Sequence, residues 1–378
     1  MKLRKILFTI ISAAAAVNIC AGAIAGTAHG AEEFPKTSAM AYAVYDTASG
    51  RFLGGKNTGK TLPMASTTKI MTAITAIERL DIKKEITITK EHLSEGSSMY
   101  LRVGERLTIE QLLYGLMLMS GNDAARAIAD SSGSIDKFVG WMNETAAEIG
   151  MESSSFMNPN GLDEEGHYST AKDMALLAAY AMKNETFREI AGTRSISIAG
   201  RSMRNHNKLL RLVDGATGVK TGYTSRSGRC LVSAVERDGR EIIVVTLNAP
   251  SDWSDHRALY EYAFSKYSVE KVISQGHALC YLPVISGDVP RVAVYAGENV
   301  LVSVKEEERA ALKTQLYLSR FVYAPVQKDG YAGEAVIMLD GEEVGRTKLY
   351  FDDDAGVLKG RRGLLDKISE FAKNIVMG

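Results

Sequence analysis

The segment Ser66–Leu80 constrains the fold more than any other part of this sequence, because it is apolar on most sides of a helix. Its apolar positions leave no continuous polar face: Ile70, Met71, Ala73, Ile74, Ile77 and Leu80. A helix that is apolar nearly all round has to be enclosed by other elements. We therefore expect this segment in the middle of a domain.

The elements around this helix predict an α+β fold. Met40–Asp46 and Phe52–Gly54 read as a β-hairpin before it. The helices predicted after it are one that is capped by Thr108 and Gln111, Ile135–Ile149 and Thr170–Lys183. From Gly218 apolar residues recur at every second position, and Asp238-Gly239 marks a turn between two strands, Cys230–Glu236 and Glu241–Leu247. Strands at both ends with helices between them favour α+β over alternating βαβ units.

After Tyr267 the pattern predicts a small all-β domain. Its short alternating segments are Val292–Tyr295, Val300–Val304, Thr314–Leu318, Ala335–Leu339 and Thr347–Phe351. The last apolar stretch, Leu364–Val376, has a single apolar helical face. We therefore expect an α+β domain at 31–267, an all-β domain at 268–358 and an amphipathic helix at 359–378. That helix is too short and too polar to span a bilayer, so it is predicted to lie in the membrane interface or to pack on the β-domain.

The first 30 residues are typical of a secretory signal peptide. Lys2, Arg4 and Lys5 precede an apolar stretch, Ile6–Ala25, and small residues follow at Ala28-His29-Gly30. Cleavage is expected between Ala25 and Ala31, and an uncleaved membrane helix is the alternative. The protein is therefore expected outside the cytoplasmic membrane, on its outer face.

Charge and cysteine content exclude several classes of function. Basic and acidic residues number 45 each, and removal of the signal would leave 42 basic against 45 acidic residues. The protein therefore has no positive field that would favour binding to nucleic acid. The six histidines show no metal-ligand spacing, and neither a metal nor another cofactor is expected. Cys230 and Cys280 are far apart in sequence, and two free buried thiols are favoured over one disulfide.

Three short motifs occur in order along the α+β domain. Ser66-Thr67-Thr68-Lys69 is an S-x-x-K motif, Ser120-Gly121-Asn122 follows a helix, and Lys220-Thr221-Gly222 precedes the strand pair. Each motif is weak alone, but S-x-x-K, a Ser-x-Asn triplet and K-T-G together are typical of β-lactamases and penicillin-binding proteins.

The sequence around the motifs resembles that of the low-molecular-mass penicillin-binding proteins, the D-alanyl-D-alanine carboxypeptidase family. The resemblance extends over Ala65–Ala73, Met119–Ala125, Gly218–Thr224 and Asn158–Met174, and further through the β-domain and the tail. It implies a β-lactamase/transpeptidase-like domain that removes the terminal D-alanine from peptidoglycan stem peptides ending in D-Ala-D-Ala. It also implies covalent inhibition by β-lactams.

The chemistry of Ser66 and Lys69 explains their spacing. Lys69 lies one helical turn after Ser66, so its amine can approach the serine hydroxyl. A serine is a weak nucleophile until a base takes its proton. A free lysine is protonated at neutral pH, but burial and a neighbouring cation such as Lys220 lower its pKa by up to about 3–5 units. Lys69 is therefore the expected general base.

The other motif residues receive supporting roles from the same resemblance. Ser120 is expected to pass a proton to the leaving amine, and Asn122 to orient Lys69 and the substrate amide. Thr221 is expected to bind the substrate carboxylate beside Lys220. Gly222 is expected to let the substrate backbone lie close to the strand, and Tyr223 to line the site. The backbone N–H of Ser66 and one near Tyr223 are expected to form the oxyanion hole.

One position departs from the family pattern, and two other functions stay open. Several relatives have an arginine between two asparagines, where this chain has Asn205-His206-Asn207. We expect His206 to orient the substrate, and an arginine to bind its carboxylate: Arg204, Arg226 or Arg257. The alternatives are a β-lactamase-like hydrolase, although the region of its Glu-x-x-x-Asn loop here reads Asn158–Asp163, and a catalytically silent wall-associated protein.

Overall fold

The computed structural model describes residues 34–358. The predicted signal peptide and the predicted amphipathic helix lie outside the described residues. Within residues 34–358, every helix is too short or too polar to cross a bilayer.

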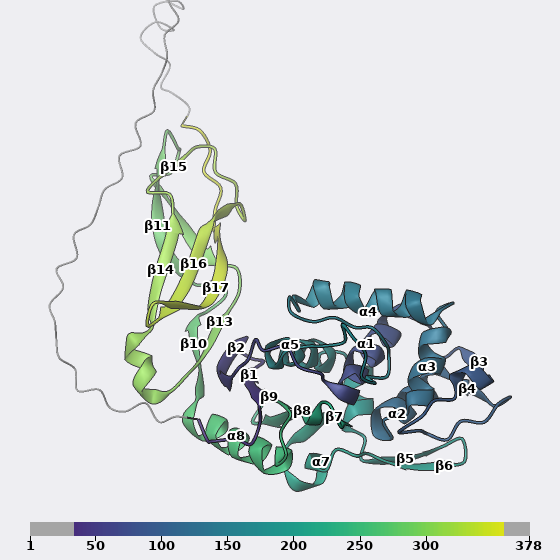
Figure 1. The fold of residues 1–378 in the computed structure, drawn as a ribbon. Coiled ribbons are helices and arrows are strands. Elements are labelled where there is room, and N and C mark those ends of the chain that lie inside the picture. Colours follow the sequence, from purple (N-terminus) through teal and green to yellow (C-terminus); the bar gives the residue numbers. More distant parts are fainter. Residues whose placement is uncertain (1–33, 359–378) are drawn as a thin grey trace, which may run out of the picture. The chain divides into compact units, whose positions relative to one another are not determined.

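A five-stranded antiparallel sheet organises the N-terminal domain (Figure 1). Its order is β2-β1-β9-β8-β7, so the first hairpin pairs with a strand that lies some 200 residues later in the chain. The strands are β1 (Ala41–Asp46), β2 (Arg51–Lys56), β7 (Ala216–Thr224), β8 (Gly228–Arg237) and β9 (Arg240–Leu247). Both predicted hairpins are confirmed, and β7 is an edge strand with one side unpaired within this sheet.

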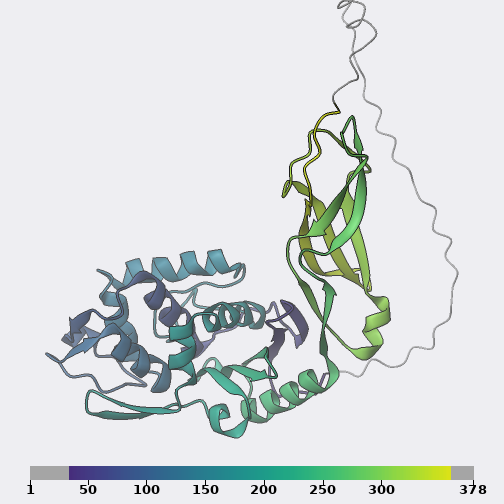
Figure 2. The ribbon, with the colours of Figure 1, turned by 180° about the vertical axis from the view of Figure 1, so that it is seen from behind.

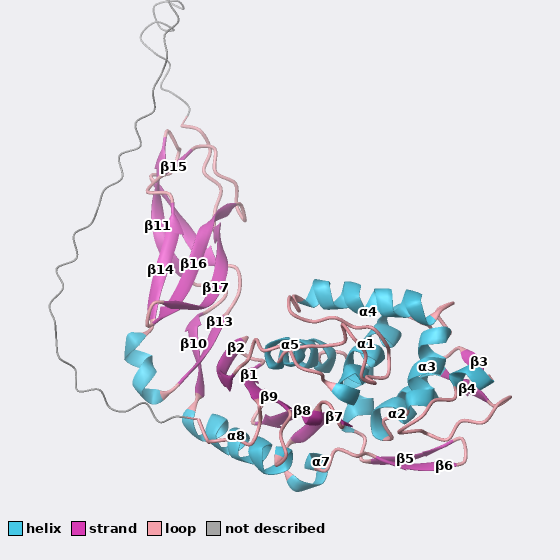
Figure 3. Ribbon diagram, viewed as in Figure 1, coloured by secondary structure: helices cyan, strands magenta, loops and turns pink. Residues whose placement is uncertain are grey.

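Helices cover both faces of this sheet (Figures 1–3). One face packs on a group of helices: α1 (Lys69–Arg79), α2 (Ile109–Leu118), α3 (Asn122–Asp130), α4 (Ile135–Ile149), α5 (Ala171–Met182) and α6 (Glu185–Gly192). The other face packs on α8 (Asp252–Lys266), and α7 (Leu209–Leu212) adjoins it. The alternation of β8 explains the two cores, since Val232 and Ala234 belong to the first and Leu231 and Val235 to the second.

Helix α1 lies in the first core with most of its side chains buried, as its apolar surface predicts. The turn η1 (Ala65–Thr68) leads into it. Smaller elements flank the helices: β3 (Glu85–Thr87), η2 (Lys90–His92), β4 (Arg106–Thr108), β5 (Ser195–Ile198) and β6 (Arg201–Arg204). The pattern of apolar residues did not predict helix α8, because buried polar residues, His256 among them, interrupt its apolar face.

The C-terminal part is the predicted all-β domain with a core of its own. A six-stranded sheet has the order β14-β16-β17-β12-β11-β15, and β10 pairs with β13. The elements are β10 (Ser268–Ile273), β11 (Ala278–Ile285), β12 (Arg291–Ala296), β13 (Val300–Val304), η3 (Glu306–Ala311), β14 (Lys313–Leu318), β15 (Val322–Tyr323), β16 (Tyr331–Leu339) and β17 (Glu342–Phe351). All five strands expected there are present, and β10, β11 and β15 are additional.

Candidate active site

Ser66 and Lys69 meet at the start of α1. Ser66 lies in the turn η1 and Lys69 is the first residue of the helix, which brings both side chains to one side. The Nζ atom of Lys69 lies 2.9 Å from the Oγ atom of Ser66. Ser66 is partly exposed, whereas Lys69 is completely buried. Ser66 is thus accessible from the surface, whereas its partner Lys69 lies in the interior.

The surroundings of Lys69 favour its neutral form. Burial lowers its pKa well below the ordinary lysine value, the positive charge of Lys220 lowers the pKa further, and Asp123 opposes the shift. Besides Ser66, the amine contacts Asn122 Oδ1 at 2.8 Å and the backbone carbonyl of Asn160. A neutral amine has two N–H donors for these two oxygens and one lone pair left for the serine hydroxyl.

Asn122 is held in one orientation. Its Nδ2 atom donates to the carbonyl of Glu95 at 2.7 Å, which leaves Oδ1 to accept from Lys69. The neighbouring carboxylate of Asp123 accepts from the backbone N–H groups of Met99 and Leu101, at 3.0 and 3.1 Å. Sequence reasoning missed this role of Asp123, which fixes the loop beside the site.

Lys220 and Ser120 form a second buried pair. The Nζ atom of Lys220 donates to Ser120 Oγ at 3.1 Å and to the carbonyl of Thr221 at 2.9 Å. Burial lowers the pKa of Lys220 to about 7. Ser120 has a φ of 59°, a backbone conformation that few non-glycine residues adopt and that is concentrated at functional sites.

The loop Asn158–Asp163 packs against the turn η1. The φ of Gly161 is 82°, and a Cβ there would lie 2.1 Å from the carbonyl oxygen of Ala65. Only glycine permits this approach. The loop therefore supplies Lys69 with a backbone acceptor at Asn160 and not with a carboxylate side chain.

His167 stabilises the same turn, although the sequence analysis gave it no role. Its Nδ1 atom accepts from the N–H of Met157 at 3.0 Å, so its Nε2 atom carries the proton and donates to Thr68 Oγ1 at 2.8 Å. Thr68 then donates to the carbonyl of Ala65. Burial lowers the pKa of His167 to about 4 and keeps it neutral at pH 7. His167 lies in Asn158–Met174, one of the segments that resemble the family, and this was the available sequence signal for a role at the site.

Gly222 brings the edge strand β7 close to the backbone of Ser66. A Cβ at this position would lie 3.0 Å from Met64 O, from Ser66 N and from Thr67 N. The expectation that glycine makes room for substrate was therefore incomplete, because the protein's own backbone already needs that space. The N–H of Ser66 lies beside β7, where a carbonyl oxygen bound over Ser66 would need a donor.

A cleft of about 770 Å³ opens over these residues. Six of the nine predicted site residues line it: Ser66, Ser120, His206, Thr221, Gly222 and Tyr223. Lys69, Asn122 and Lys220 lie buried beneath it. Burial and the charge of Lys220 lower the pKa of His206, so that histidine is mostly neutral at pH 7. Tyr223 is 67% exposed.

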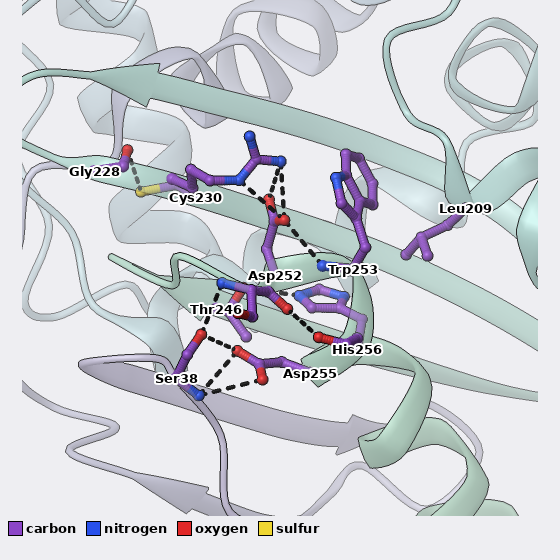
Figure 4. A network of polar contacts seen from close by, with 12 residues as sticks. Ser38, Leu209, Gly228, Cys230, Thr246, Asp252, Trp253, Asp255 and His256 are labelled. Atoms are coloured by element: carbon purple, nitrogen blue, oxygen red, sulfur yellow. Dashed lines mark hydrogen bonds and ion pairs between the residues drawn. The ribbon is translucent and has the colours of Figure 1, made fainter.

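Of the three candidate arginines, Arg204 lines the cleft, and Arg226 and Arg257 are not among its lining residues. Arg229, which the sequence analysis missed, also lines it and binds both carboxylate oxygens of Asp252, at 2.9 and 3.0 Å. Figure 4 shows Asp252 beside Trp253 at the start of α8, with Ser38 and Asp255 below them. The charge of Arg229 is thus compensated, whereas Arg204 has no ion pair or side-chain hydrogen bond within residues 34–358.

The two cysteines are unpaired, as expected, but only one of them is fully buried. Both Cys230 and Cys280 are free thiols, the first buried and the second only partly so. Within residues 34–358, three or more His, Cys, Asp or Glu side chains nowhere gather as metal ligands.

Comparisons with known proteins agree with this geometry. The family described as D-alanyl-D-alanine carboxypeptidase matches residues 28–251, and the C-terminal domain of penicillin-binding protein 5 matches residues 267–356. The Bacillus subtilis D-alanyl-D-alanine carboxypeptidase DacF is 32% identical over 81% of this chain and 83% of its own. A carboxypeptidase of the same name from Streptomyces sp. strain K15 is 34% identical over 70% of this chain and all of its own. The crystal structure of Haemophilus influenzae penicillin-binding protein 5 superposes with a TM-score of 0.78, at 25% identity over 86% of this chain and all of that one. The chain belongs to the D-alanyl-D-alanine carboxypeptidase family of low-molecular-mass penicillin-binding proteins.

Proposed function

We propose that this protein is a serine-type D-Ala-D-Ala carboxypeptidase that removes the terminal D-alanine from peptidoglycan stem pentapeptides. One contact carries the proposal. The buried Nζ atom of Lys69 lies 2.9 Å from the Oγ atom of Ser66, and Ser66 lines the cleft. A buried amine with a lowered pKa beside a surface hydroxyl is the arrangement of a base and its nucleophile.

Acylation begins with transfer of the Ser66 proton to Lys69. The Ser66 oxygen forms a bond to the penultimate D-alanine carbonyl carbon, and the carbonyl oxygen takes the negative charge. The N–H of Ser66 donates to that oxygen, together with a second N–H on β7 near Tyr223. Asn122 and Asn160 accept hydrogen bonds from Lys69, so the amine stays aimed at the serine as it gains a proton.

Loss of D-alanine then requires a proton on its nitrogen. Ser120 offers its hydroxyl to that nitrogen, and Lys220 replaces the proton, because its pKa of about 7 allows it to give one up at neutral pH. The C–N bond breaks, and the acyl-enzyme ester at Ser66 remains. Lys69 then gives up the proton that it took from Ser66 and Lys220 regains one, so the amine of Lys69 is neutral again. Water attacks this ester with Lys69 as the base, the ester C–O bond breaks, and the proton taken from water passes to the Ser66 oxygen.

The terminal carboxylate of the substrate needs a positive partner beside Thr221, because a buried anion without one is unfavourable. Arg204 fits this role better than the other two arginines, since it lines the cleft and its charge is uncompensated within the described chain. His206 fits a neutral hydrogen-bonding role, since its pKa lies below the ordinary histidine value.

The termini fit an exported protein held at a membrane surface. On this proposal residues 1–30 are removed on export, and residues 31–267 and 268–358 form the two domains. The one-sided apolar pattern of Leu364–Val376 favours a peripheral anchor on the outer face of the membrane.

Release of D-alanine from diacetyl-Lys-D-Ala-D-Ala by the purified protein tests the proposal. We expect one D-alanine per peptide, and none from the variant Ser66→Ala. A protein that binds the peptide without releasing D-alanine would be a silent wall-binding protein, and the proposed activity would be wrong.

A further inference from the structure

One wall of the cleft carries positive charge that the reaction as described does not use in full. From β6 onward, alternate side chains are exposed and line the cleft: Ser202, Arg204, His206 and Lys208. The residues between them are buried: Met203, Asn205 and Asn207. Arg211 of α7 continues the same lining. We call Arg204, Lys208 and Arg211 the cationic wall.

The charges of the cationic wall are uncompensated. Within residues 34–358 none of the three side chains makes an ion pair or a side-chain hydrogen bond. Arg201, on the same strand, is by contrast paired with Glu105. Among the described residues that line the cleft, Asp252 is the one carboxylate, and it is bound to Arg229. The wall therefore presents a local positive field, although the whole chain is neutral.

The position of the wall relative to β7 decides which part of a substrate faces it. His206, which lies between Arg204 and Lys208 in the sequence, lines the cleft together with Thr221 and Gly222 of β7. Arg211 also borders a second hollow, whose lining includes Ala216 and Thr217, the first residues of β7, and the acidic residues Asp214 and Glu236. Arg211 thus lies near the N-terminal end of β7, and all three cations line the same cleft as Ser66 and Thr221. On the proposed function, a substrate with its scissile carbonyl over Ser66 and its carboxylate at Thr221 has its leaving residue in the cleft that this wall lines.

D-Alanine leaves most of this charge without a partner. Its single carboxylate is bound by Thr221 and Arg204. Its methyl group is uncharged and gives Lys208 and Arg211 no partner. Resting on the proposed function, we propose that Lys208 and Arg211 bind a second carboxylate carried by the leaving residue. The enzyme then also hydrolyses acyl-D-Ala amides of dicarboxylic D-amino acids. The bonds are those of the D-alanine reaction: the amide C–N bond breaks, water supplies the hydroxyl, and the amino acid leaves with its amine protonated.

Two isosteric peptides isolate the charge of the leaving residue: diacetyl-Lys-D-Ala-D-Glu and diacetyl-Lys-D-Ala-D-Gln. They differ by one negative charge and have nearly the same shape. We expect kcat/KM for the D-Glu peptide to exceed that for the D-Gln peptide about tenfold at low salt, because exposed charge pairs are individually weak but two act together. The ratio should fall as ionic strength rises, because salt screens exposed charges.

Charge reversal assigns the effect to the wall. In Lys208→Glu and in Arg211→Glu the D-Glu peptide should lose its advantage over D-Gln. Arg226→Glu is the matched control, since Arg226 is an exposed arginine outside the cleft lining, and it should keep the wild-type ratio. Equal rates for the two peptides in the wild type, or a ratio unchanged by both wall variants, would overturn the inference while D-alanine release stands. Absence of D-alanine release from the D-Ala-D-Ala peptide would overturn the proposed function, and this inference with it.

Discussion

The imidazole of His167 and the hydroxyl of Thr68 lie 2.8 Å apart, inside the turn that carries Ser66. The two residues are almost 100 positions apart in sequence, and their contact ties the loop before α5 to the start of α1. Since Met157 fixes the tautomer of His167, the hydrogen-bond chain from Met157 to Ala65 has one direction. The position of Ser66 thus depends on a neutral histidine outside the cleft lining.

Replacement of that histidine should weaken both the fold and the site. In His167→Phe the N–H of Met157 and the hydroxyl of Thr68 lose a partner. We expect a loss of about 1–3 kcal/mol in the free energy of unfolding, measured in urea. Acylation by benzylpenicillin should also slow. His277→Phe, at an exposed histidine of the β-domain, is the control and should stay within about 0.5 kcal/mol of the wild type.

Stability should fall as the solution becomes acidic. Burial lowers the pKa of His167 to about 4 and that of His256 to about 3 in the folded protein, against about 6.5 in the unfolded chain. Below pH 6.5 the unfolded state therefore binds more protons, and the free energy of unfolding decreases. Each histidine contributes about 1.4 kcal/mol per pH unit once its unfolded form is protonated. Urea unfolding between pH 7 and 5 checks this, and His167→Phe should make the slope shallower.

Gly222→Ala tests how closely β7 must approach the nucleophile. Its methyl group would lie 3.0 Å from three backbone atoms around Ser66, so the strand or the turn η1 has to shift. We expect at least a tenfold loss in the acylation rate, because small displacements of reacting groups have large effects on rate. Gly140→Ala on α4 meets no neighbour within 4 Å and should leave the rate unchanged. Equal acylation rates for Gly222→Ala and the wild type would contradict the tight approach.

Truncation before Gly360 tests the proposed anchor. The shortened protein should no longer sediment with membranes, and its D-alanine release from small peptides should be retained. Continued sedimentation would exclude Leu364–Val376 as the anchor.

The predicted site residues gather at one cleft because they lie in compact motifs. Ser66 and Lys69 are one helical turn apart, and local geometry alone brings them together. Sequence reasoning missed Asp123, His167 and Arg229, whose roles depend on partners 20 to 100 residues away. The fold class followed from periodicity, whereas β15 is only two residues long and gives too short a pattern to detect.

Helix α8 shows a different limit of pattern reasoning. His256 is completely buried, and its ring contacts Ser233 Oγ and Thr246 Oγ1 at 2.6 and 2.9 Å. A histidine in a sequence pattern counts as polar and therefore as exposed. Here hydrogen bonds to two strands make its burial favourable, and only the three-dimensional structure reveals those partners.

Covalent acylation by benzylpenicillin, followed by intact-protein mass, tests the central claim that Ser66 is the nucleophile and Lys69 its base. The wild type should gain one penicilloyl group, Ser66→Ala should gain none, and Lys69→Ala should react more slowly by orders of magnitude. Ser225→Ala, at an exposed serine near the site, is the control and should react as the wild type does. An adduct that persists in Ser66→Ala, or a Lys69→Ala variant that reacts at the wild-type rate, would contradict the mechanism.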